Sequence, residues 1–282
     1  MMSAAIEIRT LTDVTDLMLV QLLEKKIWNM DPLPLHQTIT ASQNGGLLLG
    51  AFLKDGMVGF SYSFAGFAKG QSYLCSHMLG IDPNHQEKGI GAILKQEQKK
   101  IAKEIGYDLI TWTYDPLESR NAYLNVSKLQ AICSAYLENC YGDMEDSLNH
   151  GLPSDRLKVE WWINSPHVLE PLTIQADQAL SIFQSETTEE GLPELIHIED
   201  SLRNITGSDV PILVPIPANF QDIKRKNPSL AIDWRFRTRY IFESLFAQGY
   251  AIVSLLKRKE GTVHDYLFVK KHVLNLNQVK RR

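Results

Sequence analysis

The pattern of apolar and polar residues changes period along the chain, from the alternation typical of strands to the 3.6-residue period of amphipathic helices. In the first half these periods predict the order β-α-α-β-β-β-α-β-α-β-β. The predicted elements are strand 7–10, helices 14–26 and 35–42, strands 47–53, 57–67 and 72–81, helix 90–105, strand 108–114, helix 118–129, and strands 131–137 and 157–163. Helices interleaved with strands in this way are typical of an α/β (α+β) fold with a mixed central sheet flanked by helices.

Two of these helices carry a predicted core face. On the first, capped by Thr12 or Asp13, the apolar stripe consists of Val14, Leu17, Met18 and Leu22. On the helix that Gly106 ends, the apolar face consists of Ile90, Ile93, Leu94, Ile101 and Ile105. The lysines, glutamines and glutamates of that second helix are expected on the opposite, solvated face.

The second half is less regular. Pro166 and Pro171 predict a boundary between a first domain, 1–165, and a smaller C-terminal α/β subdomain, 166–282. Within the subdomain the pattern predicts a loop at 185–191, an edge strand at 212–216, a helix at 228–248, and a hairpin of strands 250–256 and 263–270. The edge position follows from three nearby prolines, which cannot donate to a neighbouring strand.

Composition narrows the class of protein. The 282 residues are 44% hydrophobic and 22% charged, which is ordinary for a soluble globular protein. The sequence shows neither a membrane span nor a signal peptide, so we expect a cytoplasmic protein without a membrane partner. Three cysteines in apolar segments suit reduced thiols, and the eight histidines lack zinc-type spacing, so no metal is expected.

Positive charge is concentrated in the C-terminal part of the chain. Residues 220–282 hold 14 Lys/Arg and 5 Asp/Glu, whereas the whole chain holds 29 and 33. A basic region of this kind can face phosphates, a carboxylate substrate or nucleic acid, but more often it is a solvated surface. Because no aromatic-basic motif accompanies it, we do not expect nucleic acid as a partner.

The segment from Met78 to Leu94 holds the strongest functional signal. An apolar run ends at Asp82-Pro83, and a polar turn containing Gly89 and Gly91 leads into a helix. Glycines allow a phosphate to approach the backbone closely, and the first N–H groups of a helix favour negative charge. The spacing fits neither a dinucleotide fingerprint nor a Walker loop. A pyrophosphate cradle is therefore one interpretation, and an ordinary β-α turn with two glycines is the other.

The order Gln86-x-x-Gly89-x-Gly91, four residues after a strand that ends Ile81-x-Pro83, resembles the coenzyme A loop of the GCN5-related N-acetyltransferase (GNAT) superfamily. The order of elements over residues 6–165 resembles the same superfamily. In addition, Asp115-Pro116 and Arg120-Asn121-Ala122 resemble a branch of long predicted acetyltransferases with a C-terminal extension. Some members of that branch are associated with acylation of amino acids, including by succinyl donors.

The resemblance implies acetyl-coenzyme A or another acyl-coenzyme A as cosubstrate, lying between the strands 72–81 and 108–114. It implies that the backbone of the loop holds the pyrophosphate, through Gln86, Glu87, Lys88, Gly89, Ile90 and Gly91. It also implies a bulged strand whose free N–H, from Met78, Leu79 or Gly80, polarises the thioester carbonyl. Leu79 and Ile81 are expected to contact the cosubstrate through backbone atoms, or else only to pack in the core. Asn121 is expected to contact the pantetheine arm, or else to be a polar residue at a helix start that binds no ligand.

For catalysis, the strand before the loop offers His77 as a general base, with a packed or hydrogen-bonded strand histidine as the alternative. The general acid is where this chain departs from the family. Many members have Tyr-x-Lys-Leu-Gly where this chain has Val126-Ser127-Lys128-Leu129-Gln130. The proton donor is therefore left open between solvent and the nearby hydroxyl groups of Tyr123, Ser127, Tyr136 and Tyr141.

For the acceptor, Asp115 could hold a substrate ammonium group, and Arg235 with Arg239 could clamp a carboxylate from one face of a helix. The alternative for the arginines is a solvated face, or local pairs with Asp233 and Glu243.

Together these features predict an acyl-coenzyme A-dependent N-acyltransferase, with acetyl as the favoured group, acting on a small-molecule amine or amino acid. One alternative is a succinyl-coenzyme A-dependent amino-acid N-succinyltransferase. An alternative of another class is a non-catalytic acyl-coenzyme A sensor or interaction module. The sequence leaves a homodimer open.

Overall fold

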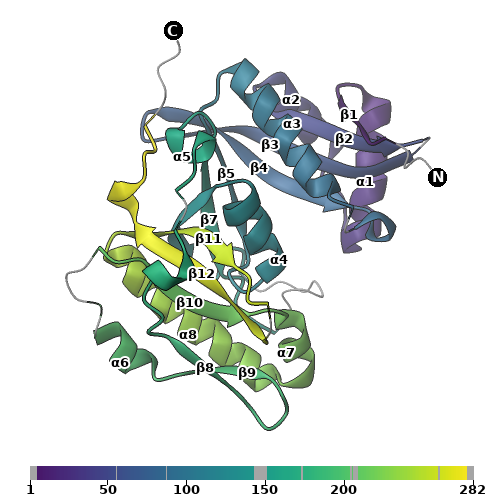
Figure 1. Cartoon of the computed structure of the whole chain (residues 1–282). Helices are drawn as coiled ribbons and strands as arrows, with labels where there is room; N and C mark the ends of the chain where they lie inside the picture. Colours follow the sequence, from purple (N-terminus) through teal and green to yellow (C-terminus); the bar gives the residue numbers. More distant parts are fainter. Residues whose placement is uncertain are drawn as a thin grey trace. The chain divides into compact units, whose positions relative to one another are not determined.

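The structure is a computed structural model (Figure 1). It describes residues 5–54, 56–86, 88–142, 151–172, 174–203, 205, 209–259 and 261–277. The chain folds into two compact units. The N-terminal unit comprises residues 1–112 with 162–164, and the C-terminal unit comprises 113–161 with 165–282.

The N-terminal unit contains a mixed sheet and three helices. Its elements are β1 (Glu7–Thr10), α1 (Val14–Trp28), α2 (Leu35–Gln43), β2 (Leu47–Leu53), β3 (Gly56–Ala68), β4 (Gln71–Ile81), the 3₁₀ turn η1 (Pro83–His85), α3 (Ile90–Ile105) and the greater part of β5 (Leu109–Tyr114). The strands follow the order β1-β2-β3-β4-β5. Neighbours from β1 to β4 are antiparallel, and β5 is parallel to β4.

The C-terminal unit is built on an antiparallel sheet in the order β7-β6-β11-β12-β10. Its strands are β6 (Ile132–Leu137), β7 (Arg156–Trp162), β10 (Ile212–Pro217), β11 (Tyr250–Leu256) and β12 (Val263–Lys270), with a separate pair of β8 (Gln184–Thr187) and β9 (Pro193–Ile196). Its helical segments are α4 (Ser119–Ala122), the π-helix η2 (Tyr123–Lys128), α5 (Pro166–Leu169), η3 (Ala176–Gln178), α6 (Ile198–Arg203), α7 (Phe220–Lys226), α8 (Pro228–Ala247) and η4 (Lys271–Val273).

The predicted order of elements in the first half is confirmed, as are the edge position of β10 and the hairpin of β11 and β12. Two predictions were wrong. The helix expected at 118–129 is one turn of α4 followed by a π-helix. The loop expected at 185–191 begins within β8, which pairs with β9, because the polar residues of this strand lie on an exposed two-stranded ribbon.

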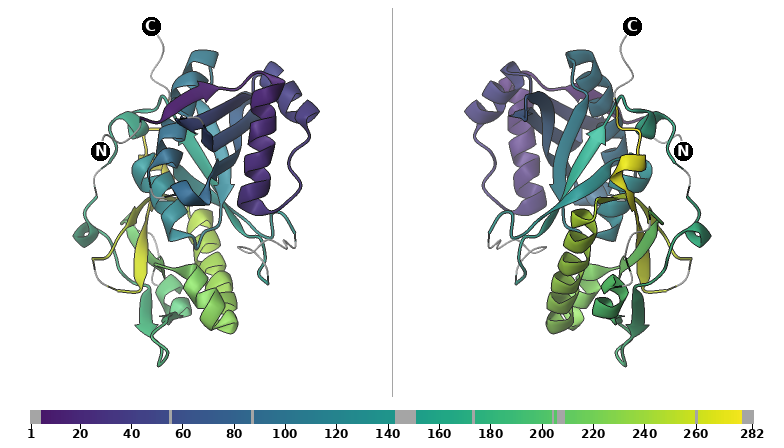
Figure 2. Two further views of the ribbon diagram at one scale, coloured as in Figure 1. Left: turned by 90° about the vertical axis from the view of Figure 1, so that its right-hand side faces the viewer. Right: turned by 90° about the vertical axis from the view of Figure 1, so that its left-hand side faces the viewer.

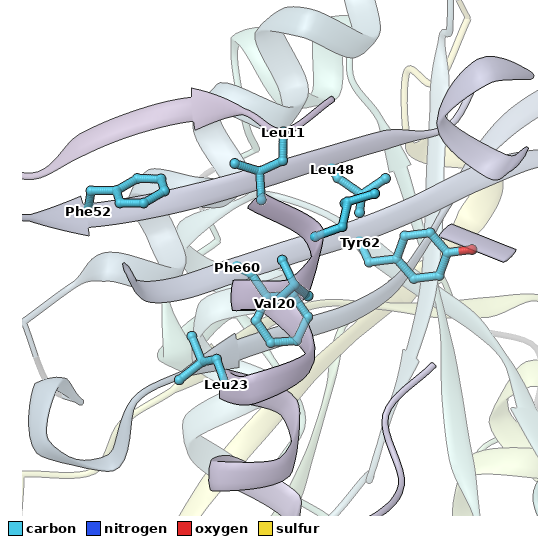
Figure 3. Packing of buried hydrophobic residues seen from close by; sticks show 8 residues of the cluster. Leu11, Val20, Leu23, Leu48, Phe52, Phe60 and Tyr62 are labelled. Atoms are coloured by element: carbon cyan, nitrogen blue, oxygen red, sulfur yellow. The ribbon is translucent and has the colours of Figure 1, made fainter. Parts of the chain in front are cut away.

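In the N-terminal unit, α1 and α3 cover opposite faces of the sheet (Figure 2). Alternate residues of β3 point to opposite faces, so Phe60 and Tyr62 face α1, whereas Ser61 and Ser63 face α3. On the α1 side, Val20 and Leu23 pack with Leu11, Leu48, Phe52, Phe60 and Tyr62 in one apolar cluster (Figure 3).

The core faces predicted for both helices need correction. On α1, Leu17, Val20 and Leu23 are buried, whereas Val14, Met18 and Leu22 are 51%, 53% and 68% exposed. On α1, apolar residues lie around more than half of the helix circumference, so hydrophobicity alone does not choose the buried face. On α3, Lys95 and Gln98 are buried and Ile93 and Ile105 are exposed, because the serines of the sheet lie on that side.

The two compact units do not coincide with the predicted domains. β6 and β7, expected in the first domain, share a sheet with β11, β12 and β10 of the C-terminal part. The domain boundary at 165 stays a prediction. Cys75, Cys133 and Cys140 are free thiols, and among the helices that the structure describes none has the length and apolarity to cross a bilayer.

Candidate functional site

The glycine loop leads directly into α3. Gly89 is the N-cap residue, with a left-handed backbone at φ 75° that glycine adopts without strain. Among the described residues, no side chain caps this end of α3, and no atom lies within 4 Å of the position that a Cβ on Gly89 would occupy. The N–H groups of the first turn have no intrahelical acceptors, and the space beside Gly89 is open, as an anion site requires.

The other predicted loop residues divide into two kinds. Gln86 and Lys88 are exposed, whereas the Ile90 side chain is buried, so that residue can offer only backbone. A Cβ added to Gly91 would lie 3.6 Å from Leu79 Cδ2, which is an ordinary van der Waals distance. Glu87 lies outside the described residues.

Asp82 fixes the start of this loop. Its carboxylate accepts hydrogen bonds from Lys26 Nζ at 2.6 Å and from the backbone N–H of Asn84 at 3.0 Å. Its own N–H donates to the Val58 carbonyl at 2.9 Å. The hydrogen bond from Lys26 holds the pKa of Asp82 below its ordinary value. The end of β4 is thus tied both to α1 and to β3.

β4 bulges immediately before its end. Ser63 pairs with Ser76 and Tyr62 pairs with Met78, so His77 is an extra residue with no partner on β3. The expected bulge is confirmed, one residue before the three positions predicted to donate to the thioester. A bulge interrupts the ladder and leaves backbone groups unpaired at that point.

The pairing of β4 with β5 is short. Only Leu74 with Ile110 and Cys75 with Thr111 form pairs between these fully described strands. Beyond Cys75, the rest of β4 pairs with β3 alone. The place where two parallel strands stop pairing is therefore within two residues of the bulge.

His77 has an exposed side chain whose ring lies close to two aromatic rings. The ring centroids are 6.0 Å from Tyr62 and 5.8 Å from Phe64. Desolvation by these surroundings lowers the pKa of His77 below its ordinary value. The imidazole is therefore neutral and able to accept a proton at neutral pH, although its role as a base stays a prediction.

Ile81 and Asn121 have contrasting positions. The Ile81 side chain is partly buried against Gly59, where an added Cβ would come within 2.8 Å of Ile81 Cδ1, so this side chain has a packing role. Asn121 is exposed on α4 and belongs to the C-terminal unit. Its proposed contact with the pantetheine arm stays a prediction.

Asp115 and Arg235, predicted to bind the acceptor, contact each other within the C-terminal unit. Arg235 Nη2 donates to Asp115 Oδ2 at 2.5 Å, and the backbone N–H of Leu117 donates to Asp115 Oδ1 at 2.8 Å. Arg235 is 1% exposed, and its guanidinium lies 5.5 Å from the centre of the Phe220 ring. Arg239, by contrast, pairs with Asp155 and Glu138. The two arginines share a helix but bind different carboxylates.

Most of the hydroxyl groups considered as general acid already form hydrogen bonds within the protein. Tyr136 donates to Asp155 at 2.7 Å, and burial raises its pKa. Ser127 exchanges hydrogen bonds with the backbone of Leu255. Tyr141 is hydrogen-bonded to Thr113 at 2.9 Å. Val126, at the position where the resemblance predicts a tyrosine, is fully buried and offers no hydroxyl group.

One group of polar residues was missed by sequence reasoning. Lys95 and Gln98 of α3 form hydrogen bonds with serines of β3 and β4, and burial lowers the pKa of Lys95 from 10.5 to about 7. Serines at alternate positions of β3, between Phe60, Tyr62 and Phe64, were the available signal. As for metals, no cluster of three His, Cys, Asp or Glu suited to an ion occurs in the described ranges.

No protein-family model matches the chain, and no curated protein matches its sequence. Among solved structures, the chain is similar to the ribosomal-protein-S18-alanine N-acetyltransferase from Escherichia coli, with 14% identity and a TM-score of 0.47, covering 56% of this chain and 94% of the other. It is also similar to Arabidopsis thaliana NAA60 in complex with a bisubstrate analogue, with 14% identity and a TM-score of 0.47, covering 57% and 100%.

A third similar structure is a putative acetyltransferase of the GNAT family from Desulfovibrio desulfuricans, with 16% identity and a TM-score of 0.44, covering 56% and 99%. Identities of 14–16% and TM-scores below 0.5 assign neither an activity nor a substrate to this chain.

Proposed function

We propose that this chain is an acyl-coenzyme A-dependent N-acyltransferase of the GNAT type, with acetyl-coenzyme A as the favoured donor. The observation that carries the proposal is the coincidence of three features in the N-terminal unit. β4 and β5 stop pairing after Cys75, β4 bulges at His77, and the glycine loop opens the N-terminus of α3. Each feature alone is common, but their combination supports a single binding site in which they would hold the arm, the thioester and the pyrophosphate of one cosubstrate.

The phosphates are proposed to bind the free N–H groups at the start of α3. Binding by backbone groups explains why the loop needs Gly89 in a left-handed conformation and no side chain in front of it. Lys88, an exposed residue of the loop, adds positive charge.

In the proposed reaction, the nitrogen of the neutral acceptor amine attacks the thioester carbonyl carbon, and the carbon–sulfur bond breaks. His77 accepts the proton that the amine nitrogen loses, which suits an imidazole that is neutral at pH 7. A backbone N–H at the bulge stabilises the charge on the carbonyl oxygen. The thiolate of coenzyme A takes its proton from solvent, because Val126 leaves no hydroxyl at the usual position.

We propose a small amine or amino acid as acceptor. Nε and Nη1 of Arg235 are fully buried and have no hydrogen-bond partner by distance and angle among the described residues, so a carboxylate that reached them would find unused donors. If Arg235 and Asp115 bind the acceptor, Arg235→Ala and Asp115→Ala should raise the acceptor KM about tenfold or more and leave coenzyme A affinity unchanged.

The same two variants separate binding from structure. Breaking a buried ion pair costs roughly 3–5 kcal/mol of stability, so each variant's Tm must be measured beside its kinetics. A lower Tm with an unchanged acceptor KM would assign the pair a structural role only.

The proposal is tested first by thermal shift with coenzyme A, acetyl-coenzyme A and succinyl-coenzyme A. A ligand at 100 times its Kd stabilises the folded state by about 2.7 kcal/mol, which a melting curve resolves readily. The ligand with the largest shift is then used as donor in an acceptor screen that detects released thiol. Stabilisation followed by amine-dependent thiol release supports the enzyme, and the ranking decides between acetyl and succinyl transfer.

Two other results of these tests would change the proposed function. Stabilisation without thiol release for any amine would favour an acyl-coenzyme A sensor, which the absent tyrosine at Val126 makes the second candidate. No stabilisation by any of the three ligands would overturn the proposal.

A further inference from the structure

A buried polar cluster lies between α3 and the sheet in the N-terminal unit. It consists of Lys95, Gln98, Ser61, Ser63 and Ser76, none more than 4% exposed. Gln98 Nε2 donates to the three serines at 3.0–3.2 Å, and Lys95 Nζ donates to Ser76 Oγ at 2.7 Å and to Gln98 Oε1 at 3.2 Å. Burying a lysine is costly even when it is hydrogen-bonded, and an apolar residue would fill the same space more cheaply. The cluster is therefore expected to serve something other than stability.

The Lys95 ammonium group lies where β4 and β5 separate. Their last pair is Cys75 with Thr111, so continued pairing would next join Ser76 and Trp112. Lys95 Nζ contacts both of those residues. It is 2.7 Å from Ser76 Oγ and 3.7 Å from the centre of the Trp112 ring, a distance typical of a cation–π contact.

Ser76 is also the residue directly before the bulge. Ser63 pairs with Ser76, and His77 then protrudes from the ladder. A single side chain from α3 thus contacts the first residue of each strand beyond the last β4–β5 pair, and one of the two, Ser76, directly precedes the proposed base.

We infer that Lys95 is a positioning residue, which fastens Ser76 of β4 and Trp112 of β5 where these strands separate and so maintains the opening for the acyl-coenzyme A arm. This inference rests on the proposed function for the existence of that arm. It assigns to Lys95 no contact with the cosubstrate and no proton transfer.

The contact with Trp112 depends on the charge of the ammonium group. Of the neighbouring titratable groups, Cys75 on β4 favours the charged form, and Lys99 is the nearby cation on α3. β4 presents Ser76 to Lys95 and β5 presents Trp112, and none of the described carboxylates is within ion-pair distance of it. With a pKa of about 7, the amine changes charge within the range where the protein can be assayed.

The first test is spectroscopic and needs no ligand. The emission of Trp112 is isolated by subtracting the spectrum of Trp112→Phe, because the chain has five tryptophans. In the native protein, this emission should change with a midpoint near pH 7 as the charge above the indole is lost. In Lys95→Met, which matches the length of lysine without its charge, the emission should not titrate. A titration that persists in Lys95→Met would overturn the contact.

The second test measures binding of dephospho-coenzyme A, which lacks the 3′-phosphate that itself titrates near pH 6. At pH 6.5, Lys95→Met should raise the Kd about tenfold, and the affinity of the native protein should fall between pH 6.5 and 8.5 while that of the variant stays flat. Unchanged affinity in a folded Lys95→Met protein would overturn the inference and leave the proposed function intact. Absence of binding to the native protein would instead remove the proposed function, and this inference with it.

A matched pair of serine variants serves if Lys95→Met does not fold. Ser61 and Ser76 are both buried and both accept a hydrogen bond from Gln98 at 3.0 Å, but only Ser76 also contacts Lys95. Ser76→Ala should weaken binding severalfold, and Ser61→Ala should not. Equal effects of the two substitutions would assign the cluster to general core packing and overturn the inference.

Discussion

His77 is the extra residue of the β4 bulge, it stands beside two aromatic rings, and desolvation disfavours its charged form. A lowered pKa means that the imidazole remains neutral to a more acidic pH than a solvated histidine would. Activity that depends on neutral His77 is therefore expected to persist above its folded pKa and to fall only below it.

The prediction for His77 concerns turnover. His77→Gln should lower kcat about a hundredfold at pH 7 and remove the acidic limb of the pH–rate profile, because the group that accepts the proton is gone. Steady-state kinetics from pH 5 to 9 measure this, and coenzyme A affinity should stay the same. A profile that keeps its shape in the variant would show that His77 is not the base.

Lys95 yields a prediction on stability. Its pKa is about 7 in the folded protein and near 10.4 in the unfolded chain, so between these values the unfolded state binds the additional proton. Stability attributable to Lys95 must therefore rise with pH, by at most about 1.4 kcal/mol per pH unit above pH 7.

Urea unfolding of the native protein and of Lys95→Met at pH 7, 8 and 9 measures this difference. The native protein should gain free energy of unfolding relative to the variant at each step. A difference independent of pH would mean that Lys95 is not desolvated as the structure indicates.

At the scale of elements, the loop and the start of α3 act together, and two glycines allow a controlled test. Gly89 in the loop and Gly70 in the turn between β3 and β4 have nearly the same backbone, φ 75° and 76°. Neither would place a Cβ within 4 Å of a described atom. Aspartate at either position thus imposes similar backbone strain, on the order of 1 kcal/mol.

Gly89→Asp should abolish coenzyme A binding, a loss of at least a hundredfold in Kd, because a carboxylate would face the pyrophosphate. Gly70→Asp should lower the Tm similarly and bind normally. Calorimetric titration of each variant with coenzyme A measures the two Kd values. Retained binding in Gly89→Asp would show that the loop does not hold the phosphates.

Helix faces show why sequence patterns are incomplete at this scale. The boundaries of α1 were predictable from Asp13, which caps it by accepting from the N–H of Asp16, and from the prolines after it. Its buried face was not predictable, because Val14, Met18 and Leu22 are as hydrophobic as the residues that the sheet covers. On α3, three serines across the interface reverse the usual preference and bury Lys95 and Gln98.

At the scale of the whole molecule, the C-terminal unit joins segments from both predicted domains. Cys133 of β6 pairs with Ile252 of β11, and the hydroxyl groups of Tyr114 and Tyr266 lie 3.1 Å apart in the core. Asp155, which is completely buried, accepts hydrogen bonds from Arg239 at 2.8 and 2.9 Å.

A fragment of residues 1–165 is therefore expected not to fold cooperatively. It would lose the strand beside β6 and leave the Asp155 charge without Arg239, at a cost of several kcal/mol against a typical total of about 5–15. Size-exclusion chromatography and a thermal melt, with the full chain as control, test this. A monomeric fragment with a sharp melt would instead support the predicted boundary at 165.

The sequence by itself determined the local features of this protein. The strand and helix order to residue 163, the glycine loop and the position of Gly106 follow from short-range rules, in which the residues that decide lie within a few positions of each other. Tertiary structure alone decided three other features: the pairing of Asp115 with Arg235, the position of the β4 bulge at His77 rather than at residues 78–80, and the burial of Lys95 beside Trp112. Each depends on residues from different elements, whose register and faces are selected by packing across the sheet rather than by any pattern within one segment.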